Sequence, residues 1–356
     1  MRVLVAGGGT AGHIEPALNL ADELCRRDDR THVLALGTAR GLEVSLVPAR
    51  GYELAEISAF PMPRKLNVDL VKLPSRLNRA VTETRQIIAK HDIDVVVGFG
   101  GYVSIPAYFA ARKNVPFVVH EANARAGIAN RVGARFADAV AECVAGSLPN
   151  AIVTGNPLRH SIAHLDRLAL RDRARAHFGI PLNAQVVLVF GGSLGARTLN
   201  RTIGEVITQH LLGDIVILHS YGSKNEPPAA KSEHYVPLPY IEHMDLAYAA
   251  ADFVISRSGA MTVAELTAVG MPACYVPLPH GNGEQALNAE PVITSGGGVV
   301  VDDARFSADY VVNVLLPLLA NPQQIEEMSQ ASRAVGKPDA AERLADLVES
   351  VAGGKR

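Results

Sequence analysis

The chain has few cysteines, almost no net charge and few long uncharged runs, and each shortage excludes a class of protein. Cys25, Cys143 and Cys274 are the only cysteines among 356 residues, and they lie far apart with no Cys-x-x-Cys spacing. This pattern argues against a disulfide framework or a zinc site and is typical of a reducing compartment. A formal net charge of −2 gives no support for binding nucleic acid through charge, so we expect no nucleic-acid partner.

An uncharged stretch, 95–111, raises the question of a membrane-spanning helix. It is shorter than the roughly 20 residues that such a helix needs, and it contains Gly98, Gly100, Gly101 and Pro106. We predict instead a buried strand, a glycine loop and the start of a helix. Contact with a membrane is therefore expected to be peripheral.

Short apolar runs alternate with helical patterns along the chain, which predicts an α/β fold. Residues 3–6 have the pattern of a strand, and residues 15–27 that of a helix with one apolar face. The same plan restarts at 186–190, which run into a second glycine-rich turn. Further strands are predicted at 31–36, 94–97, 116–120, 215–219, 253–256 and 273–276. This rhythm is typical of parallel sheets, so we predict two Rossmann-like, doubly wound domains with a ligand cleft between them.

The linker is predicted near residues 155–159, where Gly155-Asn156-Pro157 interrupts the pattern. The first domain is then 1–159, together with a last helix at about 337–356 that crosses back onto it. The second domain is 160–336. Ligands of such folds bind at the carboxyl ends of the strands, so the candidate residues should follow the strands.

Residues 7–12 contain the spacing Gly-x-Gly-x-x-Gly between a strand and a helix, where backbone N–H groups can cradle an anion. A dinucleotide site also needs an acid at the end of the second strand. Residues 35–38 supply none, so we expect no dinucleotide and no other cofactor. His13 follows in the first turn of the helix, whose positive end favours a neutral imidazole. It is either a general base or a histidine that caps or packs the helix.

The second half of the chain offers two more helix starts of this kind, at Gly191-Gly192-Ser193 and at Ser258-Gly259. Glu265 lies about two turns into the second of these helices. Its carboxylate can accept two hydrogen bonds from ribose hydroxyls, or it is a surface glutamate on a capped helix. Gln285 follows a loop rich in proline and glycine, and its amide suits the hydroxyls of a sugar.

Asp92-Ile93-Asp94 has the Asp-x-Asp form by which some sugar transferases hold a metal diphosphate. It precedes a strand, at the end of the sheet where ligands do not bind. We therefore interpret both aspartates as solvent-exposed and predict no metal site.

Residues 60–80 combine basic and aliphatic side chains. The basic ones are Arg64, Lys65, Lys72, Arg76 and Arg79, against a single acid. This composition suits the surface of an anionic membrane. It also suits an amphipathic helix packed on the domain, and the two interpretations are compatible.

Seven motifs in this order resemble the MurG family of peptidoglycan N-acetylglucosaminyltransferases. They are Gly8-Gly9-Thr10-Ala11-Gly12-His13, Gly98-Phe99-Gly100-Gly101-Tyr102, His120-Glu121-Ala122-Asn123, Gly155-Asn156-Pro157-Leu158-Arg159, Gly191-Gly192-Ser193-Leu194-Gly195-Ala196, Arg257-Ser258-Gly259-Ala260-Met261-Thr262-Val263-Ala264-Glu265 and Gly283-Glu284-Gln285. The family often has paired glutamines where this chain has Glu284-Gln285. The resemblance covers nearly the whole chain and implies the GT-B fold.

The resemblance also implies the reaction and its place in the cell. N-acetylglucosamine would move with inversion from UDP-N-acetylglucosamine to the 4-hydroxyl of undecaprenyl-diphospho-muramoyl-pentapeptide, a step of peptidoglycan synthesis that serves cell shape and division. The first domain would face the acceptor and an anionic membrane surface, and the second would bind the UDP-sugar. The enzyme would be peripheral, on the cytoplasmic face of the cell membrane.

The resemblance implies two groups of site residues. The group expected to act on the acceptor hydroxyl is His13, Tyr102, Glu121 and Asn130. The group expected to bind the donor is Thr10, Ala11, Gly12, Asn123, Arg159, Ser193, Asn200, Ile241, Arg257, Ala260, Met261, Thr262, Val263, Ala264, Glu265 and Gln285. Within it, Arg159 and Ser193 are assigned to the diphosphate, Ile241 to uracil through its backbone, and Glu265 to the ribose.

Three questions stay open from the sequence. The catalytic base is His13 or Glu121, with Tyr102 or Asn130 orienting the hydroxyl. A UDP-N-acetylglucosamine 2-epimerase, an isomerase, resembles the same fold. A non-catalytic sugar-nucleotide-binding protein would explain the glycine loops but neither His13 nor the basic segment. Release of free UDP only when acceptor is added would separate transfer from isomerisation.

Overall fold

The computed structural model divides the chain into two compact units, which we call the first unit and the second unit. It describes residues 1–59, 68–226, 228–280 and 282–354. The first unit comprises Met1–His160 and Asp339–Arg356, and the second comprises Ser161–Pro338. Arg64 and Lys65 of the predicted basic segment lie outside the described residues.

Seven parallel strands form the sheet of the first unit, in the order β3-β2-β1-β4-β5-β6-β7. They are β1 (Arg2–Gly7), β2 (His32–Gly37), β3 (Glu53–Glu56), β4 (Val95–Gly100), β5 (Phe117–Glu121), β6 (Ala139–Glu142) and β7 (Ile152–Val153). Along β1, Leu4 and Ala6 enter one hydrophobic core while Val3 and Val5 enter another. Because both faces of the sheet are covered, its central strands are apolar throughout.

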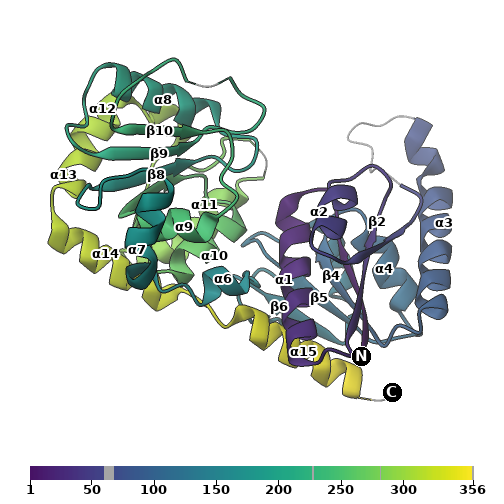
Figure 1. The fold of residues 1–356 in the computed structure, drawn as a ribbon. Helices are drawn as coiled ribbons and strands as arrows, with labels where there is room; N and C mark the ends of the chain where they lie inside the picture. Colours follow the sequence, from purple (N-terminus) through teal and green to yellow (C-terminus); the bar gives the residue numbers. More distant parts are fainter. Residues whose placement is uncertain (60–67, 227, 281, 355–356) are drawn as a thin grey trace. The chain divides into compact units, whose positions relative to one another are not determined.

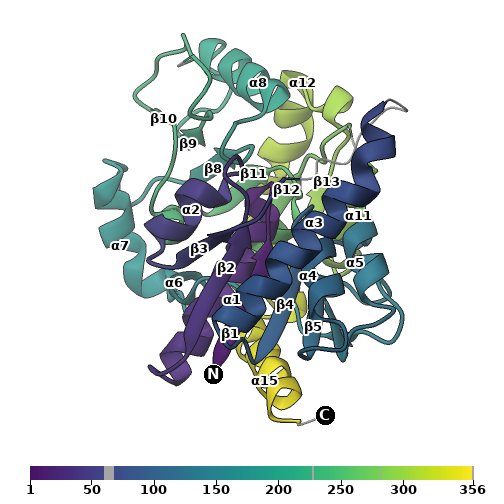
Figure 2. The same cartoon turned by 90° about the vertical axis from the view of Figure 1, so that its right-hand side faces the viewer.

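Helices cover the two faces of this sheet (Figures 1 and 2). On one face lie α1 (Ala11–Arg27), α2 (Glu43–Ala49) and α15 (Ala340–Gly353), and on the other lie α3 (Val68–Lys90), α4 (Ser104–Ala111) and α5 (Ile128–Gly133). The last helix belongs to this unit because Leu344 and Val348 are fully buried in the core that α1 also fills. Arg27 strengthens the contact through ion pairs with Asp346 and Glu349, at 2.7 and 3.1 Å.

Six parallel strands form the sheet of the second unit, in the order β10-β9-β8-β11-β12-β13. They are β8 (Val186–Phe190), β9 (Val216–Ser220), β10 (Tyr235–Leu238), β11 (Phe253–Ser256), β12 (Ala273–Tyr275) and β13 (Gly298–Val300). The helices are α6 (His160–Ala163), which spans the division, α7 (Arg167–His177), α8 (Arg197–Thr208), α9 (Met244–Ala250), α10 (Ala260–Ala268), α11 (Glu284–Thr294), α12 (Ala308–Tyr310), α13 (Leu316–Leu319) and α14 (Pro322–Val335), with a 3-10 turn η1 (Asp303–Arg305) and a π turn η2 (Val311–Leu315). These two sheets confirm the predicted α/β fold with two doubly wound, parallel halves.

The order of the strands shows where each unit would hold a ligand. The chain builds outward from β1 to β2 and β3, then restarts with β4 on the other side of β1. The second sheet repeats this pattern around β8, with β9 on one side and β11 on the other. Ligands of open α/β sheets bind outside the carboxyl ends of the strands at such a reversal. The loops there are 7–12 and 100–103 in the first unit, and 191–196 and 257–259 in the second.

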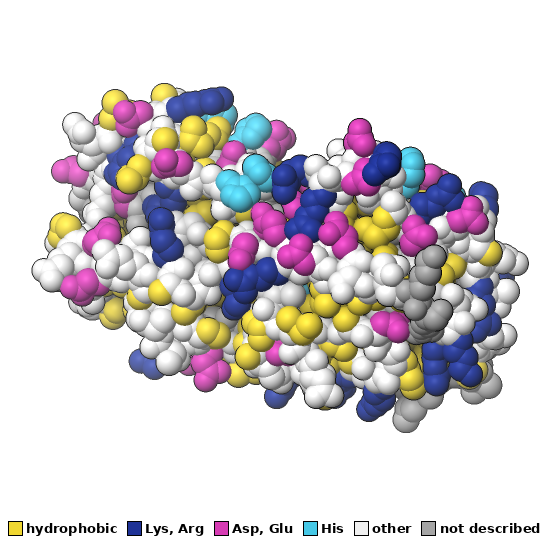
Figure 3. Space-filling model, turned by 90° about the horizontal axis from the view of Figure 1, so that it is seen from below, with side chains coloured by type: hydrophobic (Ala, Val, Ile, Leu, Met, Phe, Trp, Pro, Cys, Tyr) yellow, Lys and Arg dark blue, Asp and Glu magenta, His cyan; other side chains and the backbone are white. Residues whose placement is uncertain are grey.

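Charge is spread rather than concentrated on the face that Figure 3 shows, where acidic, basic and hydrophobic side chains are interspersed. This agrees with the net charge of −2. Among the helices whose residues are described, none is both long enough and apolar enough to cross a membrane.

Candidate active site

The first glycine loop, residues 7–12, packs against the loop that follows β4. Gly9 and Gly101 both have positive φ angles, of 88° and 78°. A Cβ atom on Gly101 would lie 2.2 Å from the carbonyl oxygen of Gly8, and one on Gly7 would lie 2.3 Å from that of His13. Only glycine permits this approach. The start of α1 is therefore fixed above the end of β4, and the exposed Thr10 and Gly12 lie at that start.

A buried carboxylate, Glu43, holds the first glycine loop from behind. It is fully buried, and it accepts hydrogen bonds from the backbone N–H groups of Gly9 and Thr38, at 3.2 and 3.1 Å, and from the hydroxyl of Tyr102 at 2.5 Å. Burial alone would raise the pKa of Glu43, but these hydrogen bonds outweigh it and lower the pKa below its ordinary value. The first unit thus keeps a negative charge directly behind its glycine loop.

Sequence reasoning missed Glu43, although a signal for it exists. The search for an acid stopped at the end of β2, whereas Glu43 begins the next helix. A Cβ atom on Gly41 would overlap its carboxylate, and one on Gly37 would lie 2.5 Å from its Cγ. Two glycines beside an acid at the carboxyl end of a strand therefore indicate a carboxylate that packs where a Cβ atom would otherwise lie.

Tyr102 lies between Glu43 and the glycine loop. Its hydroxyl also contacts Thr38 Oγ1 at 2.9 Å, and a Cβ atom on Gly9 would lie 2.9 Å from its ring. Burial, followed by the hydrogen bond to Glu43, raises the pKa of Tyr102 to about 12. The phenol therefore stays protonated near neutral pH and acts as a support for the loop.

His13 is the third residue of α1 and is half-buried. Its Nδ1 atom lies 3.1 Å from Thr10 Oγ1. A Cβ atom on Gly100 would lie 3.2 Å from its Nε2 atom, so the imidazole rests on the end of β4. The geometry brings His13 to the carboxyl edge of the sheet, where an imidazole can exchange a proton with a bound ligand.

Glu121 and Asn130 form a buried polar cluster after β5. The Glu121 carboxylate is 3% exposed and accepts hydrogen bonds from the N–H groups of Asn123 and Gly127, at 2.9 and 3.1 Å, and from Asn130 Nδ2 at 2.9 Å. Asn130 also accepts the Tyr108 hydroxyl at 2.7 Å. Both side chains are thus committed to shaping the 121–130 loop, which presents the half-buried Asn123.

Arg159 lies in the first unit, where its guanidinium forms an ion pair of 2.8 Å with Glu15 on α1. Glu15 also pairs with Arg50 at 2.9 Å. The neighbouring loop is held by His120, whose Nε2 atom lies 2.9 Å from the Gly155 carbonyl oxygen. Burial lowers the pKa of His120 to about 4, so its ring is neutral. In this structure Arg159 therefore has an acidic partner on its own unit.

The second glycine loop, residues 191–196, has exposed residues at its tip, Ser193 among them. A Cβ atom on Gly195 would lie 2.1 Å from the Tyr221 carbonyl oxygen, so this loop also depends on glycine for a close approach. Asn200 supports it from α8, donating to Tyr221 O at 2.8 Å and contacting His219 Nε2 at 3.1 Å. Burial lowers the pKa of His219 to about 4. Asn200 thus supports the loop through neutral groups.

The start of α10 combines a helix N-terminus with buried hydroxyl groups. Ser258 is fully buried, and among the described residues its Oγ atom has no hydrogen-bond partner. Ala260, Met261, Thr262, Val263 and Ala264 form the first turns after it, and the first N–H groups of a helix have no acceptor within it. Buried hydroxyls are normally satisfied. The Ser258 hydroxyl and the N-terminus of α10 therefore form a polar site that suits an anion.

Arg257, the residue before Ser258, is held by Asp303 and by the residues just after β12. It forms an ion pair with Asp303 at 2.5 Å and donates to the carbonyl oxygens of Val276 and Pro277, at 3.0 and 3.1 Å. These contacts fix the loop after β12. After that loop, in the first turn of α11, Gln285 Oε1 accepts the N–H of Leu278 at 2.9 Å.

Two predicted donor residues lie on either side of α9. Ile241 is 4% exposed, and the contact of its backbone with uracil stays a prediction. Glu265 is half-buried on α10, and its Oε2 atom accepts the hydroxyl of Tyr248 at 2.7 Å. Tyr248 did not stand out in the sequence because nothing local pairs it with Glu265.

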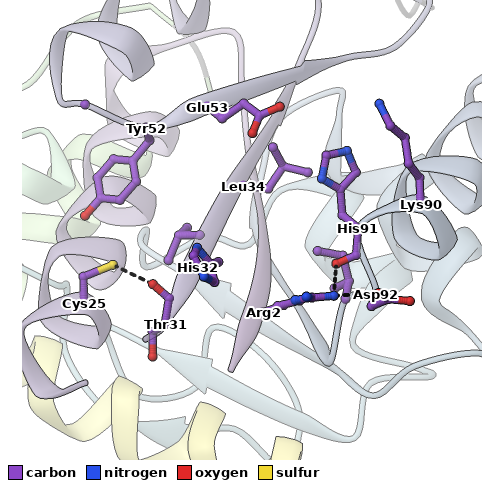
Figure 4. Close-up of a pocket in the computed structure, with 13 residues that line it drawn as sticks. Arg2, Cys25, Thr31, His32, Leu34, Tyr52, Glu53, Lys90, His91 and Asp92 are labelled. Atoms are coloured by element: carbon purple, nitrogen blue, oxygen red, sulfur yellow. Dashed lines mark hydrogen bonds and ion pairs between the residues drawn. The ribbon is translucent and has the colours of Figure 1, made fainter. Parts of the chain in front are cut away.

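The Asp-x-Asp motif lies in a depression of about 600 Å³ at the amino edge of the first sheet (Figure 4). Asp92 is exposed and pairs with Arg2 at 2.6 Å, and Asp94 accepts the N–H of Arg2 at 2.7 Å. Across the described residues, no group of three or more His, Cys, Asp or Glu side chains is arranged to hold a metal ion. These aspartates anchor the chain where β1 and β4 begin.

Two doubly wound parallel units, each with a glycine loop where its strand order reverses, form the GT-B fold. Residues 3–142 match the glycosyltransferase family 28 N-terminal domain, and residues 186–344 match the glycosyltransferase family 28 C-terminal domain. The chain belongs to glycosyltransferase family 28.

Relatives narrow the likeness further. A protein of Mycobacterium sp. (strain KMS), named UDP-N-acetylglucosamine--N-acetylmuramyl-(pentapeptide) pyrophosphoryl-undecaprenol N-acetylglucosamine transferase, is 54% identical over 99% of this chain and 98% of its own. The crystal structure of Acinetobacter baumannii MurG is 28% identical, with a TM-score of 0.77, over 98% of this chain and 99% of that one. A UDP-GlcNAc 2-epimerase from Neisseria meningitidis has a TM-score of 0.70 over 98% of this chain and 100% of its own, but is 14% identical, so it shares the fold alone.

Proposed function

We propose that this chain transfers N-acetylglucosamine from UDP-N-acetylglucosamine to the 4-hydroxyl of undecaprenyl-diphospho-muramoyl-pentapeptide. One observation carries the proposal: 54% identity over 99% of the chain to a relative named for this transfer. The alternative, a 2-epimerase, has only the likeness of fold at 14% identity. The reaction makes the lipid-linked disaccharide from which peptidoglycan is built.

The second unit is proposed to bind the donor. The diphosphate would meet the N-terminus of α10 and the exposed Ser193, with the buried Ser258 hydroxyl directly behind that helix end, and Glu265 would hold the ribose. Hydrogen-bond donors that are already in place stabilise the negative charge that develops on UDP as it leaves, without rearrangement of the protein during the reaction. Arg159, assigned to the diphosphate by the resemblance, is paired with Glu15 in this structure.

The first unit is proposed to hold the acceptor and to supply the base. His13 fits this role because its imidazole is half-buried at the carboxyl edge of the sheet and is held through Thr10. Glu121 is the weaker candidate, since the residue is 3% exposed and its carboxylate already accepts hydrogen bonds from Asn123, Gly127 and Asn130. Glu121 and Asn130 are therefore proposed to position the loop that presents Asn123.

A peripheral site on the cytoplasmic face of the membrane is part of the proposal. Arg112 and Lys113 directly follow α4, and Arg131 and Arg135 lie on and just after α5; all four are exposed, and α4 and α5 lie beside α3 (Figure 2). Ile128 and Phe136 are also exposed, at 55% and 38%, and the Arg112 guanidinium lies 3.9 Å from the centre of the Phe136 ring. These residues are proposed as the membrane face. Basic groups around apolar ones suit an anionic bilayer, where each contributes about 1 kcal/mol.

Liposome sedimentation tests this face. Replacing the four basic residues by Gln should release the protein from anionic vesicles, while binding to neutral vesicles stays unchanged. A matched control replaces Arg30, Arg40, Arg171 and Arg201, basic residues elsewhere on the chain. Equal loss in both variants would mean that charge alone matters and that this face has no special role.

The reaction is tested with radiolabelled UDP-N-acetylglucosamine and a lipid-linked muramyl acceptor. Label should appear in the lipid fraction, and free UDP should be released only when the acceptor is present. UDP release or epimerised sugar without the acceptor would contradict the proposal and favour the isomerase.

A further inference from the structure

A buried tyrosine holds the carboxylate of Glu265. The hydroxyl of Tyr248, on α9, donates to Glu265 Oε2 on α10 across 2.7 Å. Tyr248 is 0% exposed, whereas Glu265 is half-buried and reaches the surface. An ionised carboxylate can only accept, so the direction of this bond is fixed. The buried partner therefore restrains the accessible one.

The helices that carry this pair are themselves joined by one guanidinium. Arg167 donates to the carbonyl oxygens of Tyr248 and Ala251, at 3.1 and 2.8 Å, at the end of α9. It also donates to Gly270 O at 3.3 Å, just beyond the end of α10. Both helix ends carry partial negative charge, which a cation stabilises. Arg167 thus fixes the spacing of α9 and α10 at their C-terminal ends. This spacing determines whether the Tyr248 hydroxyl reaches Glu265.

We infer that Tyr248 is a positioning residue that presents Glu265 to the hydroxyls of the nucleotide ribose. The inference rests on the proposed function, in which Glu265 is the ribose ligand. A glutamate loses much rotational freedom when it is immobilised. The hydrogen bond from Tyr248 restricts the Glu265 side chain before the ligand binds, so less binding free energy is spent on immobilising it. A carboxylate has room for about four hydrogen bonds, so one phenol does not saturate it.

This arrangement also predicts selectivity for ribose over deoxyribose. A carboxylate fixed for two neighbouring hydroxyls loses a partner when one hydroxyl is missing, and a site that holds polar groups in place penalises such a ligand. If the carboxylate could move freely, it would readjust and the penalty would be smaller. Removing the tyrosine hydroxyl should therefore weaken UDP more than 2′-deoxy-UDP.

The experiment measures the affinity of the full chain for UDP and for 2′-deoxy-UDP by calorimetry. Tyr248→Phe removes one oxygen and keeps the ring. Tyr275→Phe is the matched control, because Tyr275 is equally buried in the second unit and, among the described residues, its hydroxyl has no hydrogen-bond partner. Glu265→Gln and the double variant complete a cycle. Thermal unfolding is followed for each variant.

Tyr248→Phe should weaken UDP about tenfold, which corresponds to about 1.4 kcal/mol, and should narrow the preference for UDP over 2′-deoxy-UDP by about threefold. Tyr275→Phe should change neither. In the Glu265→Gln background, loss of the Tyr248 hydroxyl should cost less than about twofold, because it acts through Glu265. A general loss of fold would lower the unfolding temperature and weaken both ligands equally.

Two failures can be told apart. If Glu265→Gln leaves both affinities unchanged, Glu265 does not hold the ribose, and this part of the proposed function falls together with the inference. If Glu265→Gln removes the preference for ribose but Tyr248→Phe does not narrow it, the proposed ligand stands and the positioning role of Tyr248 is overturned.

Discussion

The two glycine loops of this chain share a backbone plan and differ in the charge behind them. Each follows the first strand of its sheet and each needs glycine to approach a neighbouring loop. The buried carboxylate of Glu43 lies behind the first loop and accepts a hydrogen bond from the N–H of Gly9. The second loop is held by neutral amides: Asn225 Nδ2 donates to the Leu194 carbonyl oxygen at 2.7 Å, and Asn200 Nδ2 donates to that of Tyr221 at 2.8 Å. The next strand end of this unit, at Ser258, adds a buried neutral hydroxyl and a helix N-terminus.

This difference bears on which ligand each unit can take. An N–H group that is committed to a carboxylate cannot bind phosphate, and the negative charge repels a second anion. A glycine-rich turn therefore does not by itself identify a phosphate site. The charge behind the turn decides, and here it favours the diphosphate in the second unit and a hydroxyl-bearing ligand with a proton acceptor in the first.

The largest effect is expected from His13→Ala, which removes the proposed base of the first loop. We expect kcat to fall by about 10²- to 10⁴-fold, the usual contribution of a general base, while UDP affinity stays within a few fold. Steady-state kinetics and calorimetry on the same preparation measure both. Near-normal turnover at saturating substrates would exclude His13 as the base and make Glu121 the next residue to test.

A carboxylate introduced at the start of α10 should give the second unit a buried negative charge, as Glu43 gives the first. Ser258→Asp should bind UDP roughly 100- to 1,000-fold more weakly than Ser258→Asn, which has the same shape without the charge. Two like charges about 4 Å apart repel by about 4 kcal/mol at an effective dielectric of about 20. Calorimetry at two salt concentrations measures the difference. Equal affinities would place the diphosphate away from Ser258.

Neutralising Glu43 sharpens the comparison from the other side. Glu43→Gln should lower kcat by about tenfold, because either orientation of the amide places an N–H group against an N–H or O–H donor of the loop. The affinity for UDP should stay unchanged. Unpaired buried donors should also cost roughly 1–3 kcal/mol of stability. Tyr102→Phe removes one donor and keeps the charge, so it should be milder. A large loss of UDP affinity in Glu43→Gln would contradict the assignment of the units.

The smallest effect is a pH dependence of stability. The pKa of Glu43 is lowered in the folded state, so its contribution is present above the ordinary value of 4.5 and is lost as the pH falls toward the folded value. The native protein should therefore lose more stability between pH 5 and pH 3 than Glu43→Gln does. Denaturant unfolding at several pH values measures this, and parallel curves would show that Glu43 is not ionised in the fold.

The central part of the fold was predictable because its strands are buried on both faces. Such strands appear as unbroken apolar runs, as β1, β4 and β8 do. The strands β3, β6, β7, β10 and β13 were not predicted. Glu53–Glu56 has an acid at each end, Ile152–Val153 has two residues, and Tyr235–Leu238 contains a proline. Edge strands owe their place to a neighbour rather than to their own pattern.

The candidate site divides in the same way. Residues fixed by a local motif, such as His13 after the glycines or Ser258 before α10, could be placed from the sequence. Glu43 and Tyr248 could not, because their partners are set by how distant segments pack. The ion pair of Arg257 with Asp303 could not be predicted either, since it joins segments 46 residues apart.

The last helix, α15, fixes the order in which the chain can mature on the ribosome. The core of the first unit is incomplete until Leu344 and Val348 enter it, whereas the second unit is one continuous segment, Ser161–Pro338. At roughly 5–20 residues per second, synthesis of that segment takes on the order of 10 to 35 seconds. Throughout that interval the apolar side of α1 lacks its partner. The part of the protein made first is thus the part finished last.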